Sequence, residues 1–462
     1  MLSRKSKIEN RKSEIRNQQY YVRTVIALAI AVVVLCLLAV IVYNLPPVHD
    51  RLAWRLDDLR TRIIYALKPP ENAIFLPGGD QLPSPVIRTA QITPTLTETP
   101  PTLPTIAFET PLVSSPTPSP TATITPTPLP DQVTLPGVKY EDQHGRWNYC
   151  GPSNLSMALT FWGWKGNRDV VGKYIKPEDK DKNVMPYEMK DFVDTQTSGF
   201  SALIRYGGDV EMIKHMLAGG FPVLVEKGYM ERDYTGKISW LGHYQYVTGY
   251  DDAQGVFIVQ DTYIENGKNH KTNYAEFSAG WLTFDYLFLM VYPSERDQEV
   301  LTLLGPYADP AWANQHALDL ATAGSETSTG LDLFFSWFNI GTSHVNLQQY
   351  VDAASAYDYA FSLYANLPED GTRPYRIMWY QTGPYWAYYY SGRYQDVIDL
   401  ASTTLYDTIS EPLLEESFYW MALAKEALGN VQGAIDDLKE SVRLNPNFTA
   451  GWEQLKRLGV EP

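Results

Sequence analysis

Cysteine is nearly absent from this chain of 462 residues, which contains only Cys36 and Cys150. Cys36 lies inside a long apolar run that we expect to cross a membrane, so the two thiols cannot meet and no disulfide framework is possible. A lipoprotein cleavage site would need a small residue before the cysteine, whereas Leu35 stands there, so we interpret Cys36 as a packing residue. Cys150 is therefore a free thiol whose presence needs its own explanation.

Positive charge is scarce beyond the first part of the chain. Residues 1–68 carry a net charge of +7 within a total of −15, which leaves −22 for the remainder. Such an acidic surface would repel phosphates, so we exclude nucleic acid as a partner. The sequence also lacks a cluster of metal-ligating residues and a glycine-rich phosphate loop, so we expect neither a metal site nor a cofactor.

A single uncharged run, from Val25 to Tyr43, is long enough to cross a bilayer. At about 1.5 Å per helical residue it spans roughly 30 Å. A cleavable signal peptide has a shorter apolar region followed by small residues, whereas this run ends in Tyr-Asn-Leu-Pro-Pro. We therefore expect an uncleaved transmembrane helix over residues 25–45. No second run of comparable length follows, which predicts a single-pass protein.

Basic residues before this run predict its orientation. Residues 1–24 contain seven Lys or Arg residues, and the positive-inside rule keeps such a tail in the cytoplasm. We expect a cell-membrane protein with a cytoplasmic N-terminus and with all later domains outside. Residues 48–68 place leucine and isoleucine at helical spacing between arginines, which fits either an amphipathic helix at the lipid headgroups or a dimerisation helix.

The composition changes again in residues 69–135, which are dominated by Pro and Thr from residue 83 onward. Such a segment cannot bury enough apolar surface to offset its ordering entropy, and proline keeps it extended. We expect a disordered stalk that holds the later domains away from the membrane, either O-glycosylated or unmodified.

Two folded regions are expected beyond the stalk. Residues 136–296 mix helical stretches with strand-like runs, which is an α+β pattern. Residues 306–462 are almost wholly helical in pattern. The predicted fold class is therefore an α+β domain followed by an all-α region.

Cys150 is followed by Gly151 and Pro152 and then by apolar residues at helical spacing. Proline suits the first turn of a helix, so Cys150 is expected at a helix N-terminus. Unpaired amides and the positive end of the helix dipole favour the thiolate there. A lone cysteine is more often a buried packing residue, but this position, in a chain that otherwise avoids cysteine, favours a nucleophile.

A nucleophilic cysteine needs a base, and the base needs an orienting acceptor. His243 opens an alternating strand pattern that turns at residues 251–255 into a second strand, which ends at Asp261. The two indices sum to 504 and the turn centres near 253, so His243 and Asp261 are expected almost opposite each other in an antiparallel hairpin. Such a pair can be purely structural. Together with Cys150 it forms a candidate catalytic triad.

These motifs, in this order, resemble the papain-like family thirty-nine of the cysteine peptidases, which is named for the bacteriocin-processing double-glycine leader peptidases. The resemblance is strongest to the stand-alone bacterial relatives of that family. The shared elements, which cover about a third of the chain, are Gln143 ahead of Cys150-Gly151-Pro152, the stretch from Gly220 to Val225, the stretch from Gly242 to Asp251, and Asp261-Thr262-Tyr263.

The resemblance implies a papain-like fold and a role for each matching residue. Cys150 would attack the scissile carbonyl as a thiolate, His243 would carry the proton to the leaving amine, and Asp261 would fix the imidazole tautomer. Gln143 matches the family's oxyanion glutamine. It stands further ahead of Cys150 than the family pattern leads us to expect, so Asn148 is the second candidate donor. An ordinary loop glutamine is the other interpretation of Gln143.

Helical stretches in residues 306–462 recur with loose periodicity and are similar to tetratricopeptide repeats. Equivalent starts at 337, 381 and 418 are further apart than the usual period of about 34 residues, so we expect insertions, mainly at 368–374. Stacked helix pairs would form a solenoid with a concave surface. Its tyrosines and tryptophans suit either recognition of a protein partner or ordinary core filling.

The resulting hypothesis is a membrane-anchored, extracytoplasmic cysteine peptidase that cleaves a peptide or protein substrate, with helical repeats for substrate or partner binding. The alternative is a non-catalytic surface adaptor whose degenerate papain-like domain binds peptides without cutting them. A third, weaker possibility is an amidase or peptidoglycan hydrolase. Nothing in the chain resembles the transporter segments of the leader peptidases, which leaves the substrate open.

Overall fold

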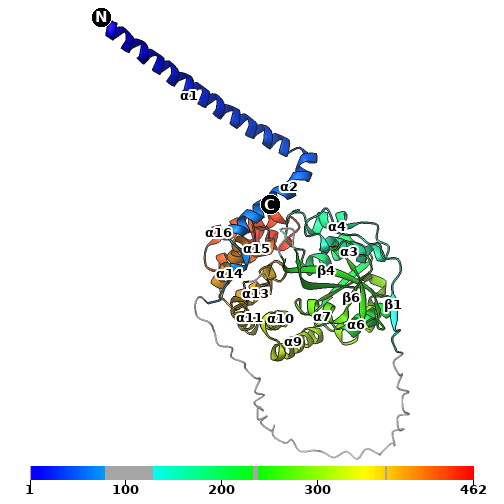
Figure 1. The fold of residues 1–462 in the computed structure, drawn as a ribbon. Coiled ribbons are helices and arrows are strands. Elements are labelled where there is room, and N and C mark those ends of the chain that lie inside the picture. The colour runs from blue at the N-terminus through cyan, green and yellow to red at the C-terminus, as the bar shows by residue number, and fades with distance from the viewer. Residues whose placement is uncertain (1, 79–127, 233–237, 370–371, 462) are drawn as a thin grey trace, which may run out of the picture. The chain divides into compact units, whose positions relative to one another are not determined.

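The computed structural model describes residues 2–78, 128–232, 238–369 and 372–461. The chain divides into two compact units. The first comprises Met1–Pro69 with Arg232–Lys237, and the second comprises Pro70–Glu231 with Ile238–Pro462. Figure 1 shows the elements of both units.

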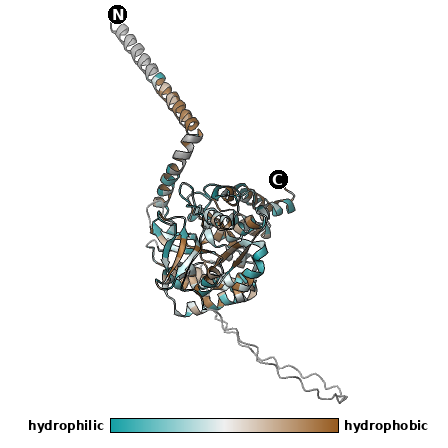
Figure 2. Ribbon diagram, turned by 90° about the vertical axis from the view of Figure 1, so that its right-hand side faces the viewer, coloured by the Kyte–Doolittle hydropathy of each residue, from teal (hydrophilic) through white to brown (hydrophobic). Residues whose placement is uncertain are grey.

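Two helices make up the described part of the first unit, α1 (Leu2–Tyr43) and α2 (Pro46–Leu67). Within α1, Tyr21–Tyr43 is the one stretch of the described residues that is long and apolar enough to cross a membrane, and it forms the continuous brown part of that helix in Figure 2. A signal sequence would give the same helix, so the anchor and its orientation stay predictions. The helix ends before two prolines, which occupy the first turn of α2, where no backbone donor is needed.

The second unit is built around a seven-stranded sheet with the order β2-β7-β3-β4-β5-β6, in which β1 pairs with the end of β4. The strands are β1 (Gln132–Thr134), β2 (Phe200–Arg205), β3 (Val223–Arg232), β4 (Ile238–Asp251), β5 (Val256–Asp261), β6 (His270–Asn273) and β7 (Phe288–Pro293). The adjacent pairs β2–β7, β3–β7, β4–β5 and β5–β6 are antiparallel.

Helices cover both faces of this sheet because successive strand residues point to opposite sides. Leu224 and Tyr244 pack against the first set of helices, whereas Val225 and Phe257 pack against the second. The first set is α3 (Cys150–Phe161), α4 (Arg168–Ile175) and α5 (Pro186–Gln196). The second set is α6 (Val210–Ala218), α7 (Tyr274–Leu282) and α8 (Asp297–Leu304).

The remainder of the second unit is helical, and successive helices pack against one another. Its helices are α9 (Pro310–Thr327), α10 (Gly330–Asn346), α11 (Tyr350–Ala365), α12 (Ile377–Tyr380), α13 (Gly383–Tyr390), α14 (Tyr394–Asp407), α15 (Glu415–Ala427), α16 (Val431–Leu444) and α17 (Thr449–Arg457). A Cβ at Gly341 would lie 2.7 Å from the Tyr357 ring, so only glycine lets α10 and α11 approach this closely. The assignment of these pairs to tetratricopeptide repeats stays a prediction.

The sheet domain and the helical region share one hydrophobic core. Trp240, Phe284 and Leu287 of the sheet domain pack with Phe338 and Tyr357 of the helical region. Polar contacts join the two parts as well, since the Asn339 amide donates to the Leu282 carbonyl at 2.6 Å. The sequence predicted two separate regions, 136–296 and 306–462. The structure has them in one compact unit, because aromatic residues of both regions contribute to the same buried cluster.

The predicted disordered range, 69–135, is too long at both ends. Pro70–Asn72 forms a short 3-10 helix, and Phe75 is buried between Phe361 and Tyr388 of the helical region, with ring centroids 5.1 and 5.9 Å away. At the other end, β1 belongs to the sheet. The rest of the predicted stalk, residues 79–127, lies outside the described residues.

This docking contradicts the role predicted for the stalk. A spacer between the membrane helix and the folded domains would have to precede those domains, whereas residues 70–78 already belong to the second unit. Residues 79–127 therefore connect two points of the same unit.

Candidate active site

Cys150 is the first residue of α3, as predicted. Asn148 adopts a left-handed conformation (φ 46°), which asparagine tolerates better than most residues, and this turns the chain into the helix. A Cβ at Gly151 would lie 3.0 Å from the Val184 Cβ, so the next residue must be small. Cys150 itself is only 7% exposed. The thiol thus lies at a helix N-terminus inside a nearly closed site.

His243 and Asp261 are also buried, and they contact each other directly. The His243 Nε2 atom lies 3.1 Å from the Asp261 Oδ1 atom. Because this contact uses Nε2, the ring nitrogen that remains for the hydrogen bond to Cys150 is Nδ1. The structure therefore brings Cys150, His243 and Asp261 together in one chain of hydrogen bonds.

The hairpin register places His243 and Asp261 almost opposite each other, as the sequence predicted. Asp261 pairs with Gln245, and His243 lies two residues further along β4 as its diagonal neighbour. The ladder also shifts by one residue between Val247 and Gly249, an irregularity of the β-bulge kind that the index sum did not include. His243 and Gln245 still point to the same side of β4, because they are two residues apart.

Asp261 accepts more hydrogen bonds than the sequence indicated. The Gln245 side-chain amide donates to Oδ2, while the backbone N–H groups of Tyr263 and Ile264 donate to Oδ1 at 2.8 and 3.3 Å. Burial would raise the pKa of Asp261, but the charge and hydrogen bond of His243, with these donors, hold that pKa well below its usual range. Gln245 was not among the predicted site residues, although its spacing from His243 was a usable signal.

These contacts favour an ion pair between Cys150 and His243. Burial would lower the pKa of His243, yet attraction to Asp261 and the hydrogen bonds to Asp261 and Cys150 raise it to about 10. Burial would likewise raise the pKa of the Cys150 thiol, yet the hydrogen bond and charge of His243 lower it below its usual value. The thiolate and the imidazolium stabilise each other.

Gln143 lies beside this group, between the first turns of α3 and the end of β5. Its backbone N–H donates to the Thr262 carbonyl at 2.9 Å, and its side-chain Oε1 accepts from the Thr262 hydroxyl at 2.9 Å. The Ser153 hydroxyl of α3 holds the preceding residue, Asp142, by its carbonyl. With Oε1 engaged, the Gln143 Nε2 donor has no hydrogen-bond partner among the described residues.

Asn148, the second candidate donor, is placed differently. Its side chain is exposed, and Nδ2 donates to the Asp181 carbonyl at 2.8 Å. That bond fixes the turn ahead of α3. The amide of Asn148 therefore has a structural partner already, whereas the Nε2 donor of Gln143 has none in the part of the chain that the structure describes.

The helical region closes over this group from one side. A Cβ at Gly242 would lie 2.8 Å from the Tyr380 ring, so α12 packs directly on the residue before His243. Arg376 donates to the Trp240 carbonyl at 3.1 Å, and Gln381 donates to the Thr283 carbonyl at 2.8 Å. Residues 368–374, predicted as an insertion between repeats, lead into this covering segment.

Residues 135–287 match the Peptidase_C39 like family.

The match contains Gln143, Cys150, His243 and Asp261 and ends just before β7. Among solved structures, the chain is similar to a Bacillus anthracis protein that is described as a C39-like peptidase, with 14% sequence identity and a TM-score of 0.29. That similarity covers 35% of this chain and 97% of the other. No curated protein matches the chain. The domain around the sheet is thus of the cysteine-peptidase type.

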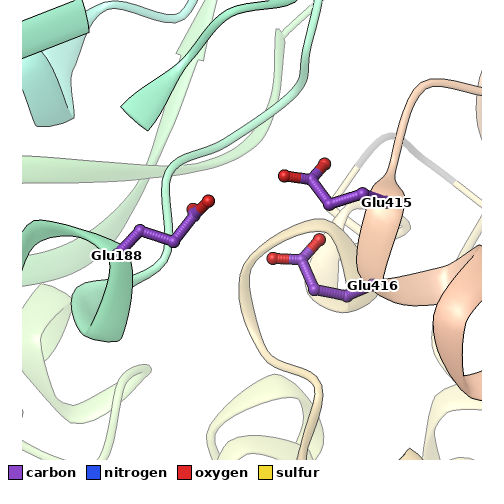
Figure 3. A group of neighbouring side chains, drawn as sticks. All are labelled: Glu188, Glu415 and Glu416. Atoms are coloured by element: carbon purple, nitrogen blue, oxygen red, sulfur yellow. The ribbon is translucent and has the colours of Figure 1, made fainter. Parts of the chain in front are cut away.

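A second buried group lies where this C39-like domain meets the helical region. Figure 3 shows Glu188 of α5 facing Glu415 and Glu416 of α15, with one carboxylate oxygen of each within 4.8 Å of the others. The Asn445 amide donates to Glu188 and Glu415 at 2.9 and 2.8 Å, and the Tyr187 hydroxyl donates to Glu416 at 2.9 Å.

The chemistry of this carboxylate group allows two states. Carboxylate oxygens are the ligands that Ca²⁺ and Mg²⁺ take, so the group could hold a hard cation. Burial and the mutual repulsion of the carboxylates also raise the pKa values of Glu188 and Glu416 well above their usual range, which favours protonated side chains. The sequence predicted no metal site and gave no signal for this group, because Glu188 is more than two hundred residues away from the adjacent pair Glu415 and Glu416.

Proposed function

We propose that this protein is a cysteine peptidase in which Cys150 is the nucleophile, His243 the proton carrier and Asp261 the orienting acceptor. The observation that carries the proposal is the buried chain of hydrogen bonds from Cys150 through His243 to Asp261. A packing cysteine would need neither a buried imidazole nor a carboxylate with four hydrogen-bond donors.

Each step follows from this geometry. The Cys150 thiolate attacks the carbonyl carbon, and the side-chain amide of Gln143, with the backbone N–H of Cys150, stabilises the oxyanion that forms. His243 gives its proton to the departing amine, which leaves a thioester on Cys150. A water molecule then gives a proton to His243 and attacks the thioester, and the collapse of the second oxyanion returns the thiolate and releases the acid.

The rest of the proposal concerns place and partners. Residues 25–45 span the cell membrane, the basic tail 1–24 stays in the cytoplasm, and the second unit lies outside, which the seven basic residues of the tail support. The substrate is a peptide or protein. The helical repeats contribute to binding it, or a protein partner, and no nucleic acid takes part.

One observation favours the second candidate, a non-catalytic adaptor. Cys150 is only 7% exposed, and Tyr380 packs against Gly242 beside it, so little of the thiol is open to a substrate carbonyl. In that case the C39-like domain would bind peptides without cutting them.

Thiol labelling separates the two candidates. The full-length protein, in detergent and with Cys36→Ser to remove the other thiol, is treated with a peptide carrying a thiol-directed electrophile under reducing conditions. We expect Cys150 to be labelled, and the label to be lost in Cys150→Ala and reduced at least about tenfold in His243→Ala, because the imidazolium maintains the thiolate. Absence of labelling in the otherwise wild-type protein would favour the adaptor.

A further inference from the structure

A cavity of about 350 Å³ lies between the C39-like domain and the helical region. Tyr187 and Tyr206 line it from the domain, and Tyr350, Tyr380 and Trp386 line it from the helical region. The volume is at the lower end of the range for small-molecule pockets, about 300–1,000 Å³, and is enough for one long side chain with part of its main chain. The cavity is therefore a pocket of side-chain size with several aromatic residues in its walls.

Glu226 is the only charged residue that lines this pocket in the described part of the chain. Its side chain is 1% exposed, and its Oε1 atom has no hydrogen-bond partner among the described residues. Nor does any described lysine or arginine form an ion pair with it. A buried carboxylate whose charge no cation balances is costly, so Glu226 calls for a ligand that supplies a positive charge and a donor for Oε1.

The pocket begins close to the nucleophile. Glu226 is near enough to Cys150 and His243 for both to affect its pKa, which burial and the Cys150 charge raise well above the usual range. Tyr244, next to His243, forms a hydrogen bond with Glu226. Tyr380, on the opposite wall, packs on Gly242 on the other side of His243. A substrate side chain in this pocket would therefore belong to a residue adjoining the scissile bond.

We propose that the pocket binds a basic side chain, lysine or arginine, of the substrate, with its cationic group on the free Oε1 of Glu226. A cation there forms a charge-assisted hydrogen bond to the carboxylate. The aliphatic stem lies against the rings of Tyr380 and Trp386, and a guanidinium or ammonium group is also attracted to aromatic faces. This proposal rests on the proposed function, and it assigns the helical region a part in substrate specificity.

Matched peptides test the preference. Turnover by the full-length protein in detergent is measured on peptides that carry lysine or its uncharged near-isostere norleucine at each position flanking the scissile bond. At one position we expect kcat/KM to be about 10- to 100-fold higher for lysine, the range that a hydrogen bond between charged groups supplies. In Glu226→Gln the ratio should fall to near one, mainly through loss on the lysine peptide.

Two further variants keep the test interpretable. Glu276→Gln removes an exposed negative charge on α7, across the sheet from the pocket, and should retain the lysine preference. Trp386→Ala changes a partly exposed wall residue and should lower kcat/KM more for the lysine peptide than for the norleucine peptide. A wild-type ratio near one at every position, or an unchanged ratio in Glu226→Gln, would overturn the proposal.

Binding separates this inference from the peptidase proposal. Cys150→Ala cannot form the thioester, so calorimetry on that variant measures peptide binding alone. Tighter binding of the lysine peptide, lost when Glu226→Gln is added, supports the pocket whether or not the wild type turns peptides over. Turnover of the norleucine and lysine peptides at equal rates, with equal binding to Cys150→Ala, rejects the pocket and leaves the peptidase in place.

Discussion

Asp261 and the carboxylate group of Glu188, Glu415 and Glu416 are equally well buried, yet their pKa values move in opposite directions. Asp261 has His243, the Gln245 amide and two backbone donors around it, and its pKa is held low. Glu188 and Glu416 face other carboxylates, and burial with that repulsion raises their pKa values. At the same depth in the protein, the surroundings thus favour the anion in one place and the protonated acid in another.

The difference shows that partners, more than burial, decide the charge of a buried carboxylate. In the active site the donors come from alternate residues of one hairpin strand, His243 and Gln245, and from the loop after the hairpin. In the carboxylate group the acids come from α5 and α15, which meet only when the C39-like domain packs on the helical region. The first arrangement fixes an imidazolium, whereas the second makes the junction sensitive to pH.

The largest loss of activity should come from removing the charge of Asp261. Asp261→Asn is expected to lower kcat about 10³- to 10⁴-fold, as loss of the orienting carboxylate does in comparable triads. With Asp261 ionised, the ion pair exists above the Cys150 pKa and is lost as the pH rises through the His243 pKa of about 10. The variant should move that upper limit to lower pH, which a pH–rate profile measures.

If Asp261→Asn kept the same upper pH limit of activity, the carboxylate would not be the group that sets the charge of His243. Asp194→Asn, which neutralises an aspartate on the exposed side of α5, is the matched control and should leave the profile unchanged.

A smaller loss of activity is expected from removing the side-chain amide of Gln143, the uncharged donor beside the Cys150–His243 ion pair. Gln143→Ala should lower kcat about 10²- to 10³-fold with little change in KM, because the amide acts on the oxyanion that forms only during the reaction. Asn148→Ala, whose amide already binds the Asp181 carbonyl, should change kcat less than about threefold. Steady-state kinetics on one peptide decide between them, and the reverse order would assign the oxyanion donor to Asn148.

The carboxylate group of Glu188, Glu415 and Glu416 should make the stability of the folded protein depend on pH. Because the folded protein holds the pKa values of Glu188 and Glu416 above their unfolded values, stability is highest at low pH and falls as the pH rises through the folded pKa values. Glu416→Gln keeps an acceptor for the Tyr187 hydroxyl and is expected to stabilise the protein at pH 8 by about 1–4 kcal/mol. Denaturant unfolding at pH 5 and pH 8 measures this.

Glu453→Gln, at an exposed position of α17, is the control and should leave the pH dependence unchanged. Destabilisation by Glu416→Gln at pH 8, together with a rise in the wild-type midpoint on adding CaCl₂, would show instead that the group is ionised and holds a cation.

The smallest loss of activity should come from removing one of the hydrogen-bond donors around Asp261. Gln245→Met removes the amide that donates to Oδ2 and leaves the other contacts of Asp261 in place. We expect kcat/KM to fall about 3- to 10-fold, since a hydrogen bond to a charged group contributes about 1.5–3 kcal/mol and water can replace part of it. A loss as large as that of Asp261→Asn would mean that Gln245 itself positions His243.

Local signals in the sequence were enough to find the candidate site. Cys150 before Gly-Pro predicted a helix start, and alternation around His243 predicted its strand. The index sum placed His243 and Asp261 almost opposite each other, and they are diagonal neighbours in the hairpin, whereas the one-residue shift near Gly249 leaves no mark on the alternation pattern. Cys150, His243 and Asp261 lie together and Gln143 lies on Thr262, next to Asp261, while Gln245 was overlooked.

Long-range packing could not be predicted in this way. Glu226 and Tyr380 face each other across a pocket although they are far apart in the chain, and each looks unremarkable in its own segment. Phe75 is a single aromatic residue at the border of a Pro/Thr-rich stretch, so its docking on α11 and α13 had no periodic signal. Such contacts depend on how the helical region packs on the sheet, which local patterns do not specify.

Residues 70–78 are held on the helical region by non-covalent contacts, in addition to their covalent connection along the chain. Along the chain, the C39-like domain is reached from the apolar helix only through residues 79–127. Through contacts, the Arg373 guanidinium already holds the Glu71 carbonyl at 2.5 Å, and the Gly78 N–H donates to Asp396 at 2.8 Å. A protease that cut between these points would leave two fragments held by these contacts, so separating them would require loosening of the helical region as well as a broken peptide bond.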